Sequence, residues 1–209
     1  QLGPVEIQSV IAREQVKKSE KTMAGGAESG APTSINDYNF IKDRYFFIDI
    51  TFKNNFYPLN ETSQHIFDTS YVIGEVELYQ KVINAETGFI QATAYLDPLN
   101  PTSDSLGGTW VKMEENIDYT IDRLLGWVRL NSVQNAIAIY YTTTTFNPAT
   151  QTFGTIPTSS NGTNSNSLKL LKEIEASTPN SPTWPLMFKN VYSLGGSNID
   201  PSGLEIEIV

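Results

Sequence analysis

Residues 117–145 read "IDYTIDRLLGWVRLNSVQNAIAIYYTTTT", and this stretch decides the fold class. Apolar and polar residues alternate over 117–121, 127–130 and 136–145, a pattern that is typical of strands with one buried face. The segments between these runs have the length and composition of turns. Because connections this short join only antiparallel neighbours, the stretch predicts a three-stranded antiparallel meander.

Other segments of the chain also predict β structure. Residues 45–52 are rich in aromatic and β-branched side chains, while 71–82 and 89–96 alternate on either side of a turn at 84–88. Each of these three segments is therefore predicted to be a strand. Residues 168–174 fit either a helix or an edge strand, and we favour the strand.

One block near the end differs from its surroundings. Residues 182–196, "PTWPLMFKNVYSLGG", place apolar side chains at helical spacing between prolines and glycines. Thr183 would cap this helix, Pro185 suits its first turn, and the glycines suit its end. The predicted fold is mainly β, an antiparallel sheet or sandwich with one short C-terminal helix packed on a sheet, and α+β is the alternative. The predicted anchors of the helix are Trp184, Met187, Phe188, Val191 and Leu194.

We expect residues 1–209 to form a single domain cut from a longer chain. The sequence does not begin with Met, and it stops inside an apparent strand at 204–209. Small, polar and glycine- or proline-rich composition predicts three flexible loops, at about 17–36, 97–108 and 147–167.

The composition argues against several classes of function. The net charge of -9 would repel phosphates, so nucleic acid is not an expected partner. The chain has no cysteine, which excludes disulfides, thiolate metal sites and cysteine nucleophiles. No apolar run reaches the roughly eighteen residues that a membrane-spanning helix requires.

Candidate catalytic residues are few. His65 is the only histidine, and its neighbours match no nucleophile motif. Glu75 and Glu77 would share one strand face, as the carboxylate pair of a glycosidase must share one site. Such pairs are also ordinary on the exposed face of an acidic protein, so we predict no catalytic residue and no enzyme activity. The other carboxylate pairs of this kind are Glu114 with Glu115, and Asp118 with Asp122.

The sequence also predicts no cofactor and no metal site. Asp97, Asn100 and Asp104 could offer oxygen ligands to calcium, but their loop lacks the spacing and the glycine of an EF-hand. Asn60 and Asn161 occupy Asn-X-Thr sequences, which matter only in a secretory eukaryotic context.

Residues 167–209 resemble a stretch that recurs in the SprA family, the bacterial gliding-motility cell-surface proteins that form the outer-membrane translocon of the type nine secretion system. The matching segments are Leu-Lys-Leu-Leu at 168–171, Pro-Thr-Trp at 182–184, Leu-Met at 186–187 and Lys-Asn-Val-Tyr-Ser-Leu-Gly at 189–195. Pro185 and Phe188 depart from the family pattern, which has an acidic residue and a Met at these positions. A looser similarity extends over residues 40–209.

This resemblance implies a very large outer-membrane β-barrel parent, of which the chain would be a soluble, non-barrel domain without catalytic residues. We therefore expect a structural domain of a protein-secretion translocon that shapes or caps the pore. The expected partners are other parts of the same translocon chain, secretion-system subunits or secreted proteins. The isolated fragment is expected to be a monomer, and the parent to lie in the outer membrane, with this fragment on the cell-surface or periplasmic side. The alternative is a cell-surface β-sandwich that binds carbohydrate or peptide, which an exposed row of aromatic side chains would favour.

Overall fold

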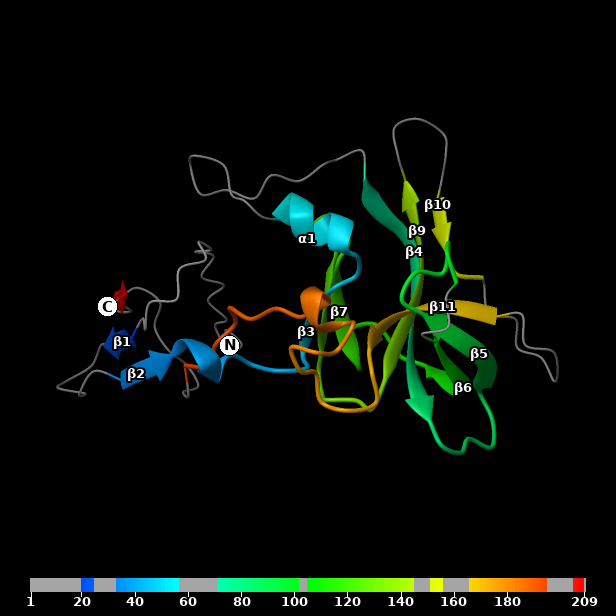
Figure 1. The fold of residues 1–209 in the computed structure, drawn as a ribbon, viewed down its shortest axis with the longest axis horizontal. Helices are drawn as coiled ribbons and strands as arrows, with labels where there is room; N and C mark the ends of the chain where they lie inside the picture. Colours follow the sequence, from blue (N-terminus) through cyan, green and yellow to red (C-terminus); the bar gives the residue numbers. More distant parts are fainter. Residues whose placement is uncertain are drawn as a thin grey trace. The chain divides into compact units, whose positions relative to one another are not determined.

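The computed structural model describes residues 20–24, 33–56, 71–101, 105–144, 151–155, 166–194 and 205–208. The fold is mainly β, as predicted from the sequence (Figure 1). The chain divides into two compact units where a single domain was expected. One unit consists of residues 1–42 with 188–209, and the other of residues 43–187.

The first unit brings together segments from near the two ends of the sequence. Its described elements are β1 (Glu20–Ala24), β2 (Thr33–Asn36), the 3-10 helix η1 (Asp37–Asn39) and β12 (Glu205–Ile208). The strand order is β12-β1-β2, and both pairings are antiparallel. Outside the sheet, the amide of Ile41 donates to the carbonyl of Val191 at 2.7 Å, and the Tyr192 hydroxyl donates to the carbonyl of Asp37 at 3.0 Å.

The second unit contains the remaining elements. They are β3 (Tyr45–Phe47), α1 (Ile50–Phe56), β4 (Val72–Val82), β5 (Phe89–Tyr95), β6 (Ser105–Lys112), β7 (Tyr119–Asp122), β8 (Trp127–Leu130), β9 (Ile137–Thr144), β10 (Gln151–Phe153), β11 (Asn166–Lys172) and the 3-10 helix η2 (Trp184–Leu186). No helix in the described part of the chain meets the length and hydropathy that crossing a lipid bilayer requires.

Five strands of this unit form a closed ring. The strand order is β9-β11-β5-β6-β4, and β4 pairs again with β9, so the sheet returns to its starting strand. The β11–β5 pairing is parallel and the other pairings of the ring are antiparallel. The strand predicted at 168–174 is confirmed by β11 as far as Lys172, but it is paired along both edges and is not an edge strand. We call β4, β5, β6, β9 and β11 the closed ring.

Alternate side chains of all five strands pack together as one core cluster. In a closed sheet, every second side chain points inward. The cluster combines large rings with four alanines, and its small residues allow the strands to close tightly around Trp110, whose indole N–H donates to the carbonyl of Ala92 at 3.1 Å. Its buried members are Tyr79, Ile90, Ala92, Ala94, Trp110, Ala136, Ala138, Tyr140, Leu168 and Leu170.

The predicted three-stranded meander is wrong in its third strand. Strands β7 and β8 form the expected antiparallel hairpin, but the far edge of β8 pairs with β3 instead of β9. Strand β9 belongs to the closed ring. The physical reason is that residues 137–143 are buried at every position, which suits a strand covered on both faces better than one at the edge of a half-exposed sheet.

The predicted strand at 45–52 ends early and becomes a helix. Strand β3 covers only 45–47, and α1 begins at Ile50. Asp49 occupies the N-cap position, because its Oδ1 accepts a hydrogen bond from the amide of Thr51 at 2.9 Å and its carbonyl accepts one from the amide of Lys53 at 3.2 Å. A capping aspartate therefore outweighs the β propensity of the following residues.

The predicted helix over 184–194 is also wrong. Only the 3-10 turn η2 forms, and Thr183, the expected cap, makes no capping hydrogen bond. Met187 is extended, with φ -75° and ψ 139°, and it bridges to Phe46. The next segment forms its hydrogen bond to a distant residue, from Ile41 to the carbonyl of Val191. The boundary between the two units falls between Met187 and Phe188.

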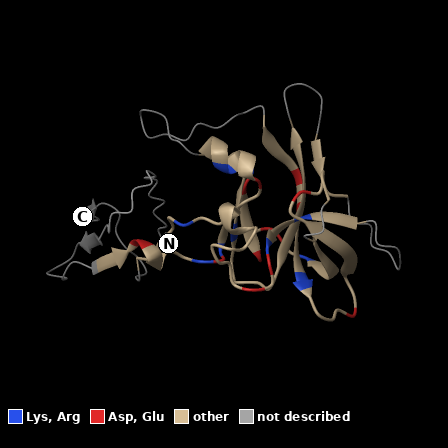
Figure 2. Cartoon of the chain, in the orientation of Figure 1, with Lys and Arg blue, Asp and Glu red and all other residues tan. Residues whose placement is uncertain are grey.

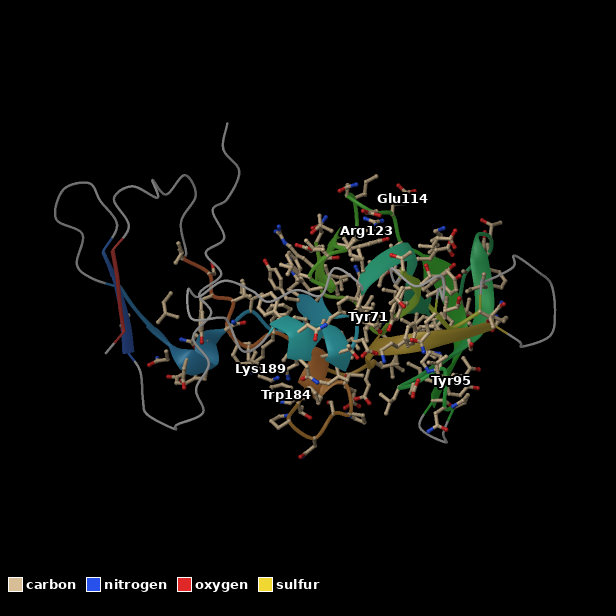
Figure 3. All side chains as sticks on the ribbon, turned by 90° about the horizontal axis from the view of Figure 1, so that it is seen from above. Tyr71, Tyr95, Glu114, Arg123, Trp184 and Lys189 are labelled. Atoms are coloured by element: carbon tan, nitrogen blue, oxygen red, sulfur yellow. The ribbon has the colours of Figure 1, made fainter. Side chains whose placement is uncertain are left out.

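The predicted anchors of this block are nevertheless mostly buried. Met187, Phe188 and Val191 are 2%, 3% and 2% exposed, whereas Trp184 and Leu194 are partly exposed. Figure 3 shows Trp184 at η2. Three of the five expected anchors are thus buried, although their spacing did not give a helix.

The three predicted loops each contain regular structure. Strands β1 and β2 lie within 17–36, β6 begins within 97–108, and β10 and the start of β11 lie within 147–167. Some of these polar strands pair with distant segments, as Lys21 does with Ile208, and others pair with a neighbouring strand, as β10 does with β9. Composition indicated loops because these small and polar residues lack the hydrophobic alternation from which strands are predicted.

Gly126 is required by close packing at the β7–β8 turn. It has φ +69°, and a Cβ built on it would lie 2.0 Å from Cγ of Phe52 on α1. Its carbonyl accepts a hydrogen bond from the amide of Ile48 at 2.9 Å. The turn therefore approaches α1 too closely for any side chain.

We predict that Gly126→Ala destabilises the chain more than Gly88→Ala does. Both positions have left-handed φ values of +69° and +67°, so alanine costs about 1–2 kcal/mol at each. A Cβ at Gly88 meets no atom within 4 Å, whereas at Gly126 displacement of Phe52 adds about 1–3 kcal/mol. Urea denaturation measures the difference, and equal losses would contradict the packing described.

We also predict that Phe188→Ala lowers the free energy of unfolding by about 3–5 kcal/mol, because it removes a buried aromatic ring. Trp184→Ala should cost less, since Trp184 is partly exposed. The exposed Asn180 provides a control, and Asn180→Ala should stay within about 0.5 kcal/mol of the parent chain. Thermal and urea denaturation test this order, and a Phe188→Ala variant as stable as the control would refute it.

Candidate functional site

The acidic residues named in the sequence analysis mostly have partners within the molecule. Figure 2 shows acidic and basic positions interspersed along residues 43–187. Glu75 and Glu77 lie on β4 and line a hollow of about 320 Å³ together with Gly74, Val76, Arg123 and Tyr140. The pairing of β4 with β9 shifts register between Ile73 and Val76, so the strand is irregular where it enters this hollow.

Glu77 is held by two neighbours. It forms an ion pair with Lys112 and accepts a hydrogen bond from the Tyr79 hydroxyl at 2.5 Å. Burial alone would raise its pKa, but these hydrogen bonds and the charge of Lys112 leave the pKa below the usual value of a glutamate. Burial and the nearby carboxylate raise the pKa of Tyr79. Glu77 is therefore ionised at neutral pH, which does not suit the general acid of a glycosidase.

Glu115 is paired in the same way. Its two oxygens accept hydrogen bonds from Nη1 and Nη2 of Arg123 at 2.7 and 2.6 Å. These bonds lower the pKa of Glu115 and raise that of Arg123. Figure 3 shows Glu114 and Arg123 near each other at the same edge of the molecule. A bidentate pair of this geometry fixes the β7–β8 hairpin rather than leaving a free carboxylate.

The remaining acidic candidates stabilise turns. Asp118 accepts from the amide of Glu114 at 2.8 Å, and Asp122 accepts from the amides of Leu124 and Leu125 at 2.9 and 2.8 Å. Asp118 and Asp122 are therefore used by the backbone of their own turns.

The calcium candidates do not form a described cluster. Asp97 accepts a hydrogen bond from the amide of Leu99 at 2.9 Å, as a turn residue. Asp104 and His65 lie outside the described residues, as do Asn60 and Asn161. Among the residues that the structure describes, no group of three or more His, Cys, Asp or Glu could hold a metal ion.

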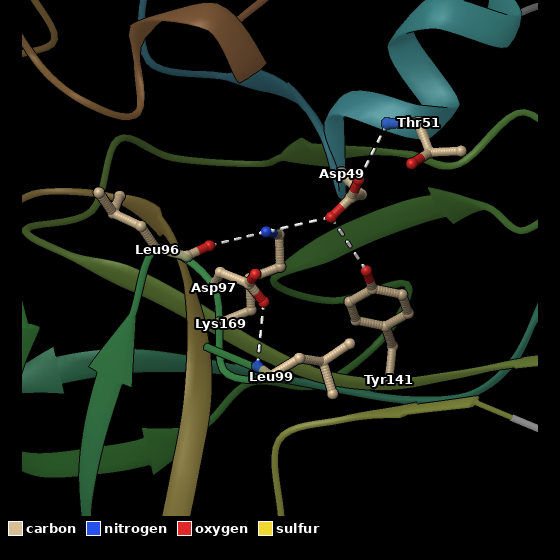
Figure 4. Close-up of polar contacts among 7 residues, drawn as sticks. All are labelled: Asp49, Thr51, Leu96, Asp97, Leu99, Tyr141 and Lys169. Carbon is tan, nitrogen blue, oxygen red and sulfur yellow. Dashed lines mark hydrogen bonds and ion pairs between the residues drawn. The ribbon is translucent and has the colours of Figure 1, made fainter. Parts of the chain in front are cut away.

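The structure brings together a buried network that the sequence analysis missed (Figure 4). Oδ2 of Asp49 lies 3.1 Å from the ammonium of Lys169 on β11 and accepts from the Tyr141 hydroxyl on β9 at 3.3 Å. The ammonium of Lys169 also donates to the carbonyl of Leu96 at 2.8 Å. The side chains of Lys169 and Asp49 are only 8% and 13% exposed. One network thus joins the start of α1 to three neighbouring parts of the closed ring.

The electrostatics of this network favour a fixed ion pair. Burial alone would raise the pKa of Asp49, but the charge of Lys169 and the hydrogen bonds from Thr51 and Lys169 lower it. Burial raises the pKa of Tyr141, and the charge of Asp49 adds to the effect. Lys, Asp and Tyr are also residues of acid–base sites, but none of these three lines the hollow beside Glu75 and Glu77. The arrangement therefore supports a structural connection.

A larger cavity opens at one end of the closed ring. Its volume is about 410 Å³. The lining consists of Leu96, Ser105, Leu106, Leu170, Glu173, Ile174, Glu175 and Pro182. Next to it, the ammonium of the buried Lys172 donates to the carbonyls of Asn135, Glu173 and Glu175 at 2.7, 2.9 and 3.1 Å. Burial lowers the pKa of Lys172, and its three bonds hold the segment that carries both glutamates.

A weak sequence signal for these features existed. Lys169 and Lys172 interrupt the apolar run of β11, which was predicted to be an edge strand. Both lysines are instead buried, at 7% and 1% exposure. A charged residue inside an apolar strand can equally indicate a buried cation whose partner comes from elsewhere in the fold.

We predict that Lys169→Met at pH 7 lowers the free energy of unfolding by about 3–5 kcal/mol, because it leaves Asp49 buried without its cation. The double variant Asp49→Asn/Lys169→Met should lose less, since asparagine still caps α1. Urea denaturation provides the comparison, and a double variant less stable than the single variant would contradict this account.

The same pair should weaken in acid. A carboxylate whose pKa is lowered by folding stabilises the folded state above its unfolded pKa, and this contribution is lost as the pH falls through the folded pKa. The stability difference between the parent chain and the double variant should therefore shrink as the pH falls below about 4. Denaturation at pH 7 and pH 3 tests this, and a difference that does not change with pH would refute it.

In comparisons with known proteins, the chain matches no protein-family model and no curated protein.

Proposed function

We propose that this chain is a structural domain of an outer-membrane protein-secretion translocon of the type nine system, outside the membrane-spanning part, and that it contacts partner subunits or secreted proteins. The observation that carries the proposal is the block at residues 182–195, which resembles the corresponding stretch of the SprA family. Three of its apolar residues, Met187, Phe188 and Val191, are buried. These three residues therefore belong to the packed interior, which accords with a role in building the domain.

The chemistry of the carboxylates supports a structural role. Glu77, Glu115 and Asp49 are each engaged by a cation within the molecule. A glycosidase instead needs one carboxyl group with a raised pKa beside an ionised one. The pKa of each of these three groups is lowered.

The proposal also covers partners and location. The proposed partners are other parts of the same translocon chain, secretion-system subunits or secreted proteins, and the proposed location is the outer membrane, on its cell-surface or periplasmic side. The charge of -9 supports protein partners over nucleic acid, because a phosphate backbone would be repelled.

The alternative function is a cell-surface β-sandwich that binds carbohydrate or peptide. Of these two ligands, carbohydrate has less support. Carbohydrate recognition by a row of stacked rings requires exposed aromatic side chains. Among the described aromatic residues, only Tyr38 is largely exposed, at 66%. The large rings Trp110, Tyr141 and Phe46 are fully buried in the core.

The test is an in-frame deletion of residues 1–209 from the parent gene in its own bacterium, with secretion of a reporter protein as the measurement. We expect secretion to be lost while the truncated parent still reaches the outer membrane. Phe188→Ala should reduce secretion in proportion to its loss of stability, and the control Asn180→Ala should not. Normal secretion by a strain with the deletion would refute the proposal.

A further inference from the structure

The cavity of about 410 Å³ borders the core cluster of the closed ring. Leu170 belongs to the core cluster, and Leu96 and Leu106 pack against it. All three also line the cavity. Ligand cavities commonly measure about 300–1,000 Å³, so this one suits a few side chains rather than a folded partner.

The rim of the cavity is acidic, whereas its floor is apolar. Glu173 and Glu175 are its charged lining residues. The carboxylates of Asp49, Glu77 and Glu115 pair with cations, but neither rim glutamate has an ion-pair partner among the described residues. The rim thus offers negative charge to a ligand.

The backbone of the rim is also fixed by hydrogen bonds from Lys172. Lys172 is only 1% exposed. Its ammonium donates to three carbonyls, two of which belong to Glu173 and Glu175. Because an ammonium has three hydrogens, these bonds leave it no further donor. Lys172 therefore positions the backbone of the rim and does not take part in holding a ligand.

We propose that this cavity binds a protein segment in which a basic side chain stands next to a bulky apolar one. The apolar side chain would enter between Leu96, Leu106 and Leu170, and the cation would meet Glu173 and Glu175. The net charge of -9 favours the approach of a cationic partner. The choice of a protein ligand rests on the proposed contact with partner subunits or secreted proteins.

The test uses the 209-residue chain and three fluorescein-labelled probe peptides. The basic probe is Gly-Leu-Arg-Leu-Lys-Gly, and its counterparts carry two Gln or two Glu in place of Arg and Lys. Fluorescence anisotropy should show the basic probe binding, the neutral probe binding more weakly, and the acidic probe not binding. Binding of the basic probe should weaken as NaCl rises from about 0.05 to 0.5 M, because salt screens rim charges.

Two double variants with equal loss of charge locate the site. Glu173→Gln/Glu175→Gln should weaken binding of the basic probe about tenfold, as expected for two partly exposed ion pairs. The control Glu86→Gln/Glu114→Gln removes two exposed carboxylates away from the cavity and should leave the affinity within about twofold. Equal weakening by both variants would show that net charge alone attracts the probe, and this would refute the site.

Absence of binding by all three probes would also refute the inference, as would equal affinity for the basic and neutral probes. Either result would leave the translocon proposal standing, because the in-frame deletion tests that proposal by secretion. Loss of binding only in the rim variant supports the site whatever the deletion shows.

Discussion

The structure of residues 43–187 depends on strand β9, which is paired along both edges and covered on both faces. One edge pairs with β4 from Ile137 to Thr144, and the other is shared by β11 and β10. On one face, Ala138 and Tyr140 join the core cluster of the closed ring. On the other, the fully buried Tyr141 reaches Asp49 at the start of α1. Residues of β9 therefore contribute to the ring, to its interior and to the contact with α1.

Closure of the ring sets strict limits on side-chain size. Ala92, Ala94, Ala136 and Ala138 occupy interior positions, while the large rings of Trp110 and Tyr140 fill the remaining space. Close packing of this kind leaves little room for polar groups without partners. The buried cations accordingly have polar partners. Lys169 contacts a carboxylate and a carbonyl, and Lys172 donates to three carbonyls.

Two sets of carboxylates in this unit differ in their partners. Asp49, Glu77 and Glu115 each hold a cation and connect neighbouring strands or turns. Glu173 and Glu175 line a cavity with apolar residues, and their backbone carbonyls accept hydrogen bonds from Lys172. The ion pairs of the first set stabilise the fold. The two glutamates of the second set are where we infer contact with another protein. The distinction depends on partners that come from distant parts of the sequence.

The sequence alone determined the β character, the hairpin of β7 and β8, and the burial of Met187, Phe188 and Val191. These properties follow from alternation, turn composition and hydrophobicity, which depend only on residues close together in the sequence. Only the tertiary structure decided that β9 leaves the meander, that 45–52 divides at the Asp49 cap, and that 184–194 forms no helix. It also decided that Lys169 and Lys172 are buried and that a cavity opens beside Glu173 and Glu175. Each of these outcomes depends on hydrogen bonds or ion pairs between segments far apart in the chain, whose energies no local pattern records.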